Sequence, residues 1–291
     1  MNPRAGRLVT YARLVQLQHT LFALPFALAG AFLGARGVPG AGAFLAVAAA
    51  MFGLRTAAMA FNRIVDRRFD ARNPRTAGRE LPTGRVSLAE AWTMSALGLA
   101  LFLAACRALN TWTLALAPLA ILLTFGYSLT KRFTSGSHLV LGAALGLAPF
   151  GGYLATHGSP AGFPWALAAA VVFWVAGFDV IYALQDEEFD KSQKLYSMPS
   201  FFGKTRALRI SEWMHLGTAA LMVFAGKMVL STAVRSGWLF WFGTIIFLVL
   251  LTYQHLIVKP NDLSRVNMAF FTTNGIASLL FGTLAIADIL T

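Results

Sequence analysis

The chain has 291 residues, of which 57% are hydrophobic and only 12% are charged. A water-soluble domain carries about 25% charged residues, so this composition excludes a soluble globular protein and favours a chain that lies mostly in lipid. The formal net charge is +12, but the basic residues lie mostly in short breaks between apolar runs, which is typical of membrane topology and argues against a nucleic-acid partner. The single cysteine, Cys106, excludes an internal disulfide and a cysteine-based metal site.

Apolar runs long enough to cross a bilayer recur along the whole chain. A membrane-spanning helix needs about 20 mostly apolar residues, and by that measure we predict an all-α, polytopic membrane protein with about nine spans. The first span follows basic residues, as in a signal peptide, but the later runs favour a retained helix. In chain order, the predicted spans are 18–35, 41–62, 88–106, 112–130, 138–156, 164–185, 211–232, 238–257 and 267–290.

Lys and Arg residues are distributed unequally between the two sides of the membrane that these spans define. Most lie in the N-terminal segment and in the loops after even-numbered spans, including the two longest loops, 63–87 and 186–210. Loops rich in Lys and Arg stay on the cytoplasmic side. We therefore expect an integral membrane protein, in a bilayer such as the bacterial inner membrane, with its N-terminus and both long loops in the cytoplasm.

Two groups of acidic residues begin where predicted spans end. In the first, Asn62, Asp66 and Asp70 are spaced by four residues, and in the second, Asp186 and Asp190 share that spacing. Residues spaced by four lie on one face of an α-helix, so each group is predicted to form a stripe that continues its span. Asp66 and Asp186 are 120 residues apart, which indicates two like-oriented halves with both stripes at the same cytoplasmic depth.

Tyr182 extends the second stripe by one turn, and Asp179 lies about one turn before it, whereas Glu187 and Glu188 lie off the stripe and are predicted to be solvated. Mg²⁺ binds carboxylate oxygens and fills its other positions with substrate phosphates. Two facing stripes therefore predict a Mg²⁺ site for one diphosphate, which the metal would stabilise as a leaving group. Surface ion pairs are the alternative explanation, which the matched depth disfavours. Basic residues that would add positive charge nearby are Arg55, Arg63, Arg67, Lys131 and Arg132.

Four residues are candidates on individual grounds. Arg55 lies inside an apolar span, where a charge is costly, so it needs an anionic partner, either the diphosphate or an aspartate. Tyr127 and Lys131, spaced by four at the end of the fourth span, contact the same substrate or belong to an interfacial aromatic belt with a flanking lysine. His19 either lines an acceptor pocket or is a buried core histidine.

At these residues the sequence resembles the UbiA family of intramembrane aromatic prenyltransferases, most of all its 4-hydroxybenzoate polyprenyltransferase branch. Three motifs of the family occur in order: Asn-x-x-x-Asp-x-x-x-Asp, Tyr-x-x-x-Lys, and Asp-x-x-x-Asp preceded by tyrosine. The stretches 72–76 and 79–84 are also similar, while Arg63 departs from the family, many members of which have an aspartate there. The matching residues are Asn62, Asp66 and Asp70, then Tyr127 and Lys131, then Tyr182, Asp186 and Asp190.

The resemblance implies a fold and a role for each of these residues. The fold would be a single domain over 1–291, with nine helices around a central cavity, a cytoplasmic cap that carries both aspartate motifs, and a lateral opening for a lipid tail. Asn62, Asp66, Asp70, Asp186 and Asp190 would hold Mg²⁺ and diphosphate. Arg55, Tyr127 and Lys131 would contact the diphosphate, Arg132 the carboxylate of the acceptor, and Tyr182 and Asp179 would flank the reacting centre.

The expected function is Mg²⁺-dependent transfer of a polyprenyl group from polyprenyl diphosphate to an aromatic acid, 4-hydroxybenzoate or a relative, on the ubiquinone or menaquinone route. A transporter is the main alternative, because like-oriented halves and intramembrane charge also occur there. Two further alternatives are a scaffold subunit and a family member that acts on a haem-type, chlorophyll-type or homogentisate acceptor. The lipid bilayer is the expected surrounding in every case.

Overall fold

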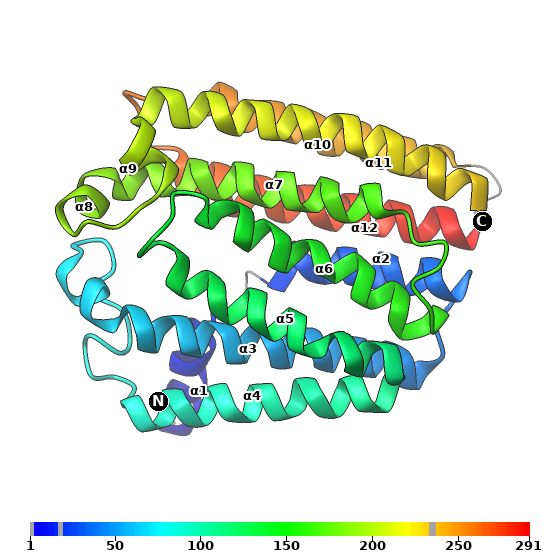
Figure 1. The fold of residues 1–291 in the computed structure, drawn as a ribbon, viewed down its shortest axis with the longest axis horizontal. Coiled ribbons are helices and arrows are strands. Elements are labelled where there is room, and N and C mark those ends of the chain that lie inside the picture. Colours follow the sequence, from blue (N-terminus) through cyan, green and yellow to red (C-terminus); the bar gives the residue numbers. More distant parts are fainter. Residues whose placement is uncertain (1–2, 17–19, 233–236) are drawn as a thin grey trace.

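The computed structural model describes residues 3–16, 20–232 and 237–291, and within these ranges the regular secondary structure is helical, without a strand. Figure 1 shows the long helices lying side by side in one bundle. The α-helices are α1 (Pro3–Leu14), α2 (Thr20–Ala35), α3 (Ala41–Arg72), α4 (Leu88–Leu109), α5 (Thr111–Thr130), α6 (Ser137–His157), α7 (Trp165–Ala183), α8 (Glu187–Ser192), α9 (Met198–Phe202), α10 (Lys204–Thr232), α11 (Trp238–Ile257) and α12 (Asn274–Leu290).

The all-α, polytopic membrane fold predicted from the composition is confirmed. Among the described residues, seven helical segments are long and apolar enough to cross a membrane, and α2 contributes a shorter apolar helix over Phe22–Ala35. The seventh predicted span, 211–232, lies within α10, which is not among the seven helices that meet this measure. The count of nine spans therefore stays a prediction.

Helix boundaries in the first half follow from local capping. Ser87 and Glu90 form a capping box at the start of α4, and Asn110 forms another with Thr113 at the start of α5. Each box satisfies backbone N–H groups that a helix N-terminus leaves without partners. The side-chain amide of Asn110 also donates to Leu154 O at 2.7 Å, so the same residue fastens the α4–α5 turn to the end of α6.

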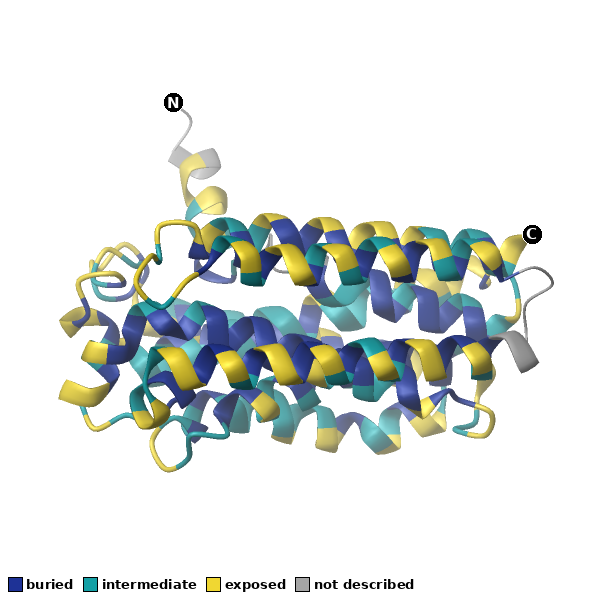
Figure 2. Ribbon diagram, turned by 90° about the horizontal axis from the view of Figure 1, so that it is seen from above, coloured by how far each residue is buried: buried dark blue, intermediate teal, exposed yellow. Residues whose placement is uncertain are grey.

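Glycines let neighbouring helices approach closely. A Cβ at Gly53 of α3 would lie 2.7 Å from Gly98 O of α4, and a Cβ at Gly98 would lie 2.7 Å from the backbone of α3. Without a strong hydrophobic force between helices in lipid, such close backbone packing is a main source of association. Figure 2 shows the buried residues on the faces where helices meet and the exposed ones on the outer surface.

Two structural features at the ends of the bundle were not predicted from sequence. Helix α1 projects from the bundle at the end where α8 and α9 lie (Figures 1 and 2), and its Tyr11 hydroxyl donates to Glu90 at 2.8 Å. A π-helical turn, Met268–Thr273, precedes α12. The Asn274 side chain donates to Ala269 O at 3.1 Å and Phe270 O at 3.0 Å, which satisfies carbonyls that the wider turn releases.

Candidate active site

A cavity of about 390 Å³ runs between α2, α3, α4, α5, α6 and α7. At one end its walls carry the aspartates and arginines of the two long loops, and at the other they are apolar, with Val47, Leu109 and Leu154. Phe270 of the π-helical turn also lines it. In Figure 1, α3 and α7 both end at the polar end. The cavity thus brings ionic and apolar surfaces together along one continuous lining.

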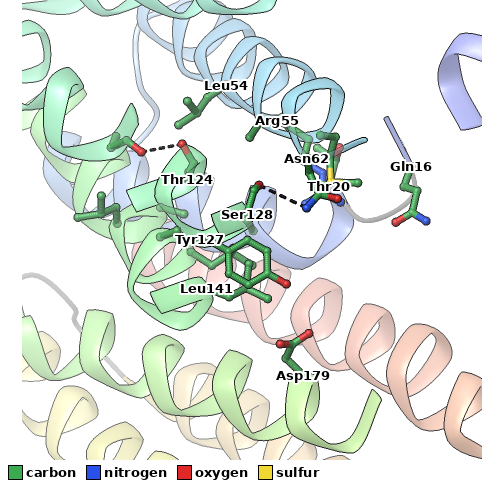
Figure 3. Close-up of a pocket in the computed structure, with 18 of the residues that line it drawn as sticks. Gln16, Thr20, Leu54, Arg55, Asn62, Thr124, Tyr127, Ser128, Leu141 and Asp179 are labelled. Atoms are coloured by element: carbon green, nitrogen blue, oxygen red, sulfur yellow. Dashed lines mark hydrogen bonds between the residues drawn. The ribbon is translucent and has the colours of Figure 1, made fainter. Parts of the chain in front are cut away.

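The first acidic group forms the stripe that its spacing predicts. Asn62, Asp66 and Asp70 all lie on α3 and line the cavity. The Asn62 side chain donates to Asp66 at 3.0 Å and to Ser128 of α5 at 3.3 Å, the latter drawn in Figure 3. The helix continues past the predicted end of the membrane span at residue 62 to Arg72, as the predicted stripe requires. It ends just before Asn73-Pro74, where proline disfavours the helical conformation of the preceding residue.

The second acidic group does not form a regular stripe, which corrects the prediction. Helix α7 ends at Ala183, a 3₁₀ turn covers Leu184–Asp186, and α8 begins at Glu187. A 3₁₀ turn has about 3.0 residues per turn, so the spacing of four no longer keeps residues on one face. Tyr182, Asp186 and Asp190 nevertheless all line the cavity, and the break in the helix turns α8 across its polar end.

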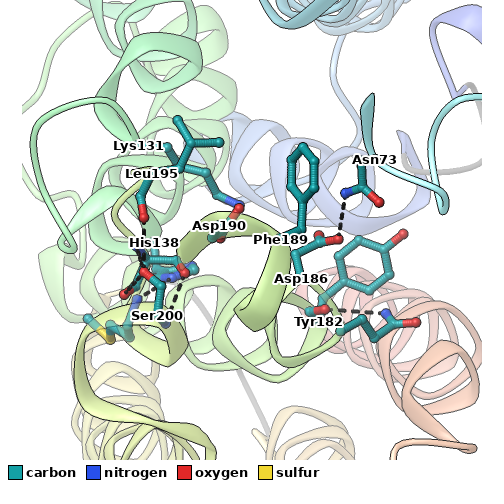
Figure 4. Close-up of polar contacts among 12 residues, drawn as sticks. Asn73, Lys131, His138, Tyr182, Asp186, Phe189, Asp190, Leu195 and Ser200 are labelled. Carbon is teal, nitrogen blue, oxygen red and sulfur yellow. Dashed lines mark hydrogen bonds and ion pairs between the residues drawn. The ribbon is translucent and has the colours of Figure 1, made fainter. Parts of the chain in front are cut away.

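Every one of the four motif aspartates has a cationic partner. The guanidinium of Arg75 holds Asp186 through two nitrogens, at 2.9 and 2.5 Å, and Figure 4 shows Asn73 donating to the same carboxylate. These pairs neutralise carboxylates that would otherwise repel one another at the end of an apolar cavity. The other three pairs are Asp70 with Arg79 at 2.7 Å, Asp66 with Arg132 at 3.4 Å, and Asp190 with Lys131 at 3.6 Å.

Asn73, Arg75 and Arg79 are site residues that sequence reasoning left without a role. They lie in the loop between α3 and α4 and line the cavity. Arg75 also donates to the Tyr182 hydroxyl at 2.9 Å, with its guanidinium 5.1 Å from the centre of that ring. Burial acts to lower the pKa of Arg75, but the hydrogen bond and charge of Asp186 outweigh it, and the pKa is raised. The family-like stretches at 72–76 and 79–84 were the available signal.

Lys131 follows the last residue of α5 and faces the second acidic group. Burial acts to lower its pKa, but Asp190, Asp186 and other nearby carboxylates outweigh that effect, so the pKa of Lys131 is raised. The ammonium therefore stays protonated and supplies a permanent positive charge at the polar end of the cavity. Its predicted neighbour Tyr127 lies one turn deeper on α5 and also lines the cavity.

Arg55 lies deeper in the cavity than the aspartates. It precedes Asn62 by seven residues on α3, which is about 10 Å along a helix. Its Nε and Nη2 atoms are buried and have no hydrogen-bond partner in the described part of the chain. A buried guanidinium with free donors is costly, so the position suits an anionic ligand that enters the cavity.

Asp179 of α7 lines the cavity and accepts a hydrogen bond from a histidine that was not predicted, His138 of α6. His138 Nδ1 lies 2.6 Å from Asp179 Oδ2, and His138 is fully buried. In Figure 3 the Asp179 carboxylate and the Tyr127 hydroxyl point toward the same part of the cavity. His138 is the first residue of the predicted span 138–156, but no motif marked it as functional in the sequence.

Of the remaining predicted residues, Arg63 also lines the cavity, and the others lie apart from it or outside the described chain. Arg67 is exposed and faces away from the cavity beside Arg68. Arg63 is buried and donates from Nε to Leu14 O at 3.3 Å, which ties α3 to α1. Glu187 is not solvated as predicted, because it is buried and pairs with Lys191 at 2.6 Å and with a second lysine, Lys204, at 3.8 Å. His19 lies outside the described residues, whereas Glu188 is exposed as predicted.

The polar end of the cavity fits a hard divalent cation that is shared with a substrate. Asp70 Oδ2 and Asp190 Oδ2 are buried oxygens that accept no hydrogen bond from the residues that the structure describes. Within the described residues, no three acidic, histidine or cysteine side chains are grouped closely enough to hold a metal by themselves. Mg²⁺ commonly takes one or two carboxylates and completes its shell with substrate phosphates and water, and this donor set matches that pattern.

Comparisons with known proteins agree with this geometry. Residues 23–276 match the UbiA prenyltransferase family. The chain is 29% identical over 274 residues to a 4-hydroxybenzoate octaprenyltransferase of Enterobacter sp. (strain 638), an alignment that covers 94% of this chain and 90% of that one. The structure of the present chain is similar to the apo structure of a UbiA homolog from Aeropyrum pernix K1. The TM-score is 0.83, with 38% sequence identity, and the match covers 94% of this chain and 98% of that one.

A second solved structure, a UbiA homolog from Archaeoglobus fulgidus bound to DMAPP and Mg²⁺, has a TM-score of 0.77 and 24% identity, and covers 96% of this chain and 99% of that one. This likeness concerns the fold. Because the family match extends over most of the described helices and their polar cavity, the chain belongs to the UbiA prenyltransferase family.

Proposed function

We propose that this enzyme transfers a polyprenyl group from its diphosphate to a phenolic acid such as 4-hydroxybenzoate, in a Mg²⁺-dependent step of quinone biosynthesis. The observation that carries the proposal is the set of four aspartates and four matched cations at the end of an apolar cavity. Membership of a prenyltransferase family favours an enzyme over a transporter, and relatives named 4-hydroxybenzoate octaprenyltransferase support the acceptor class.

The diphosphate would bind where the aspartates and cations now pair with one another. Arg75, Arg79 and Lys131 would exchange a carboxylate for a phosphate oxygen, since both are anionic acceptors for the same donors. The freed carboxylates, Asp66, Asp70, Asp186 and Asp190, with Asn62, would hold Mg²⁺. When bound, Mg²⁺ supplies Lewis-acid stabilisation of the departing diphosphate, as a complement to the positive charge of the side chains.

The acid group of the acceptor needs a cation deeper in the cavity than the diphosphate. Arg132 already donates to Val65 O at 2.8 Å and pairs with Asp66, whereas Arg55 has two buried nitrogen donors, Nε and Nη2, without a partner among the described residues. A carboxylate can accept both donors of a guanidinium in one plane. We therefore assign the carboxylate to Arg55, with Tyr127 beside it, and leave Arg132 for the rim of the site.

The reacting centre would lie between the diphosphate and the acceptor, beside an aromatic wall. Tyr182 stacks on Phe270 with ring centroids 4.1 Å apart, and both line the cavity. Ring faces stabilise a cation such as the allylic group that forms as diphosphate leaves. The apolar walls further down exclude water that would otherwise capture this cation.

The proposed function is tested with purified protein in lipid nanodiscs, a radiolabelled prenyl diphosphate, Mg²⁺ and a panel of phenols. We expect labelled product with 4-hydroxybenzoate, release of diphosphate in equal amount, and little product with the methyl ester, which lacks the carboxylate charge. Absence of product with every phenolic acid, or full turnover by both Asp66→Asn and Asp190→Asn, would contradict the proposal.

A further inference from the structure

His138 is a fully buried histidine whose two ring nitrogens both have partners outside its own helix. Nδ1 lies 2.6 Å from Asp179 Oδ2 on α7, and Nε2 lies 3.3 Å from the backbone N–H of Met198, the first residue of α9. Figure 4 shows this histidine at the polar end of the bundle, near Lys131 and Asp190. Neither the aspartate motifs nor the cation set of the proposed function uses it.

The partners of His138 fix which nitrogen carries the proton. A backbone N–H can only donate, so the Nε2 atom that faces Met198 accepts and has no hydrogen of its own. The single proton of the neutral imidazole is therefore on Nδ1 and is donated to Asp179 Oδ2. Because α9 follows directly after α8 in the chain, the way in which this segment packs on α6 sets both the tautomer and the ring orientation of His138.

This arrangement leaves Asp179 well placed to act on a bound acceptor. One oxygen of the carboxylate takes the His138 bond, and the residue lines the cavity, so the other oxygen is available to a ligand. Arg55, Tyr127 and Asp179 line the same cavity, and the Asp179 carboxylate and the Tyr127 hydroxyl point toward the same part of it (Figure 3). An aromatic acid held by Arg55 would therefore have its ring beside Tyr127, with Asp179 facing it from α7.

Transfer of a prenyl group to a ring carbon releases a proton that some group must accept. The C–O bond to diphosphate breaks, a new C–C bond forms between the allylic carbon and the ring carbon next to the hydroxyl, and that carbon then loses its hydrogen as a proton, which restores aromaticity. We infer that Asp179 accepts this ring proton and that His138 is the positioning residue that aims its carboxylate. The inference rests on the proposed function.

The test uses three variants of the full chain and an acceptor deuterated at the ring positions next to the hydroxyl. Asp179→Asn removes the base, His138→Leu removes the donor to it, and His138→Asn keeps a donor at the place of Nδ1. We expect Asp179→Asn to lower kcat by about 10²–10⁴-fold, as loss of a general base does, and His138→Leu to lower it by a smaller factor. In both, the Michaelis constant for prenyl diphosphate stays near the wild-type value.

The isotope effect separates positioning from a structural role. In the wild type we expect proton loss to be fast, so that deuteration leaves kcat unchanged, whereas in His138→Leu we expect proton loss to become slow, so that deuteration lowers kcat. His138→Asn should restore the wild-type rate and remove the isotope effect. Mg²⁺-dependent binding of prenyl diphosphate by each variant shows that it is folded, and if His138→Leu fails this check, Asp179→Asn carries the same isotope test.

If either variant, Asp179→Asn or His138→Leu, turned over at the wild-type rate and showed no isotope effect, the inference would be overturned. The ring proton would then be assigned to another acceptor, such as the released diphosphate. The proposed function would be left standing by that result. If the wild type itself prenylates no phenolic acid, the proposed function fails, and the inference fails with it.

Discussion

Arg75, at the polar end of the cavity, is a residue for which we expect two successive roles, first toward the second acidic group and then toward the substrate. It holds Asp186 with two nitrogens and the Tyr182 hydroxyl with a third, so it positions the second acidic group before a substrate arrives. In the proposed reaction the same guanidinium then faces the diphosphate. Its loss should therefore affect both the order of the empty site and the stabilisation of the leaving group.

For Arg75→Ala we expect kcat/KM for prenyl diphosphate to fall by about 10²–10³-fold, the usual cost of removing one preorganised donor to developing charge. The measurement is steady-state transfer in nanodiscs at saturating acceptor. Arg68→Ala is the matched control, since Arg68 is exposed and faces away from the cavity, and it should retain wild-type activity. Equal losses in the two variants would show that the effect is one of overall charge.

Arg55→Leu should act on the acceptor and not on the donor. Its buried Nε and Nη2 have no partner in the described ranges of the chain. A hydrogen bond to a charged group contributes about 1.5–3 kcal/mol, so the Michaelis constant for the phenolic acid should rise about 10- to 100-fold. The constant for prenyl diphosphate should change little. The opposite pattern would return Arg55 to the diphosphate, which is the role that the family resemblance implies.

At the scale of helices, the periodic part of the site was predictable and the irregular part was not. Asn62, Asp66 and Asp70 form a stripe because α3 continues without a break past the predicted span. Tyr182, Asp186 and Asp190 have the same spacing, but the 3₁₀ turn at Leu184–Asp186 rotates them. A pattern of residue types cannot reveal this 3₁₀ turn, because the turn depends on how α8 packs against the neighbouring helices.

Contacts between distant segments were also beyond the sequence. The arginine that pairs with Asp186 lies 111 positions earlier in the chain, and only the folded loop between α3 and α4 brings the two together. His138 gave no signal, because its partners belong to α7 and α9. Helix α1 was missed because it is short and basic, and the search relied on long apolar runs.

The π-helical turn predicts an effect of Asn274. Its Oδ1 accepts from Trp174 Nε1 at 2.9 Å and Gln254 Nε2 at 2.7 Å, and its amide holds the carbonyls of the turn. Asn274→Leu leaves buried donors unsatisfied, at about 1–3 kcal/mol each, so the thermal midpoint in detergent should fall. Because the turn carries Phe270, kcat should fall as well. A lower midpoint with unchanged kcat would separate the turn from the reacting centre.

The contact between α3 and α4 predicts a packing defect. A Cβ at Gly98 would lie 2.7 Å from both Gly53 O and Ala57 N, and helices that must separate to admit a larger residue lose about 1–3 kcal/mol. Gly98→Val should therefore lower the thermal midpoint. Gly126→Ala on α5 is the control, since a Cβ there has no neighbour within 4 Å, and it should leave the midpoint unchanged.

In the folded molecule every motif aspartate is paired with a cationic side chain. This balance of charge predicts how Mg²⁺ and diphosphate bind. Mg²⁺ alone would have to displace an arginine or lysine, and diphosphate alone would find those cations occupied. We therefore expect prenyl diphosphate and Mg²⁺ to bind together. Titration calorimetry should give weak binding of either one alone and tight binding of the pair, and a chelator should abolish transfer until Mg²⁺ is restored. Equal affinity for the diphosphate with and without Mg²⁺ would contradict this prediction.

The length of the cavity has a consequence for which donors the enzyme can use. Its lining on α3 extends from Val47 to Asp70, about 35 Å along a helix, which is close to the hydrocarbon thickness of a membrane. In the proposed complex the diphosphate lies at the aspartate end and the acceptor at Arg55, so the isoprenoid tail would follow the apolar residues at the far end of this lining. Discrimination by size should thus begin only with tails longer than that apolar stretch, so isoprenoids of several shorter lengths should be accepted at similar rates.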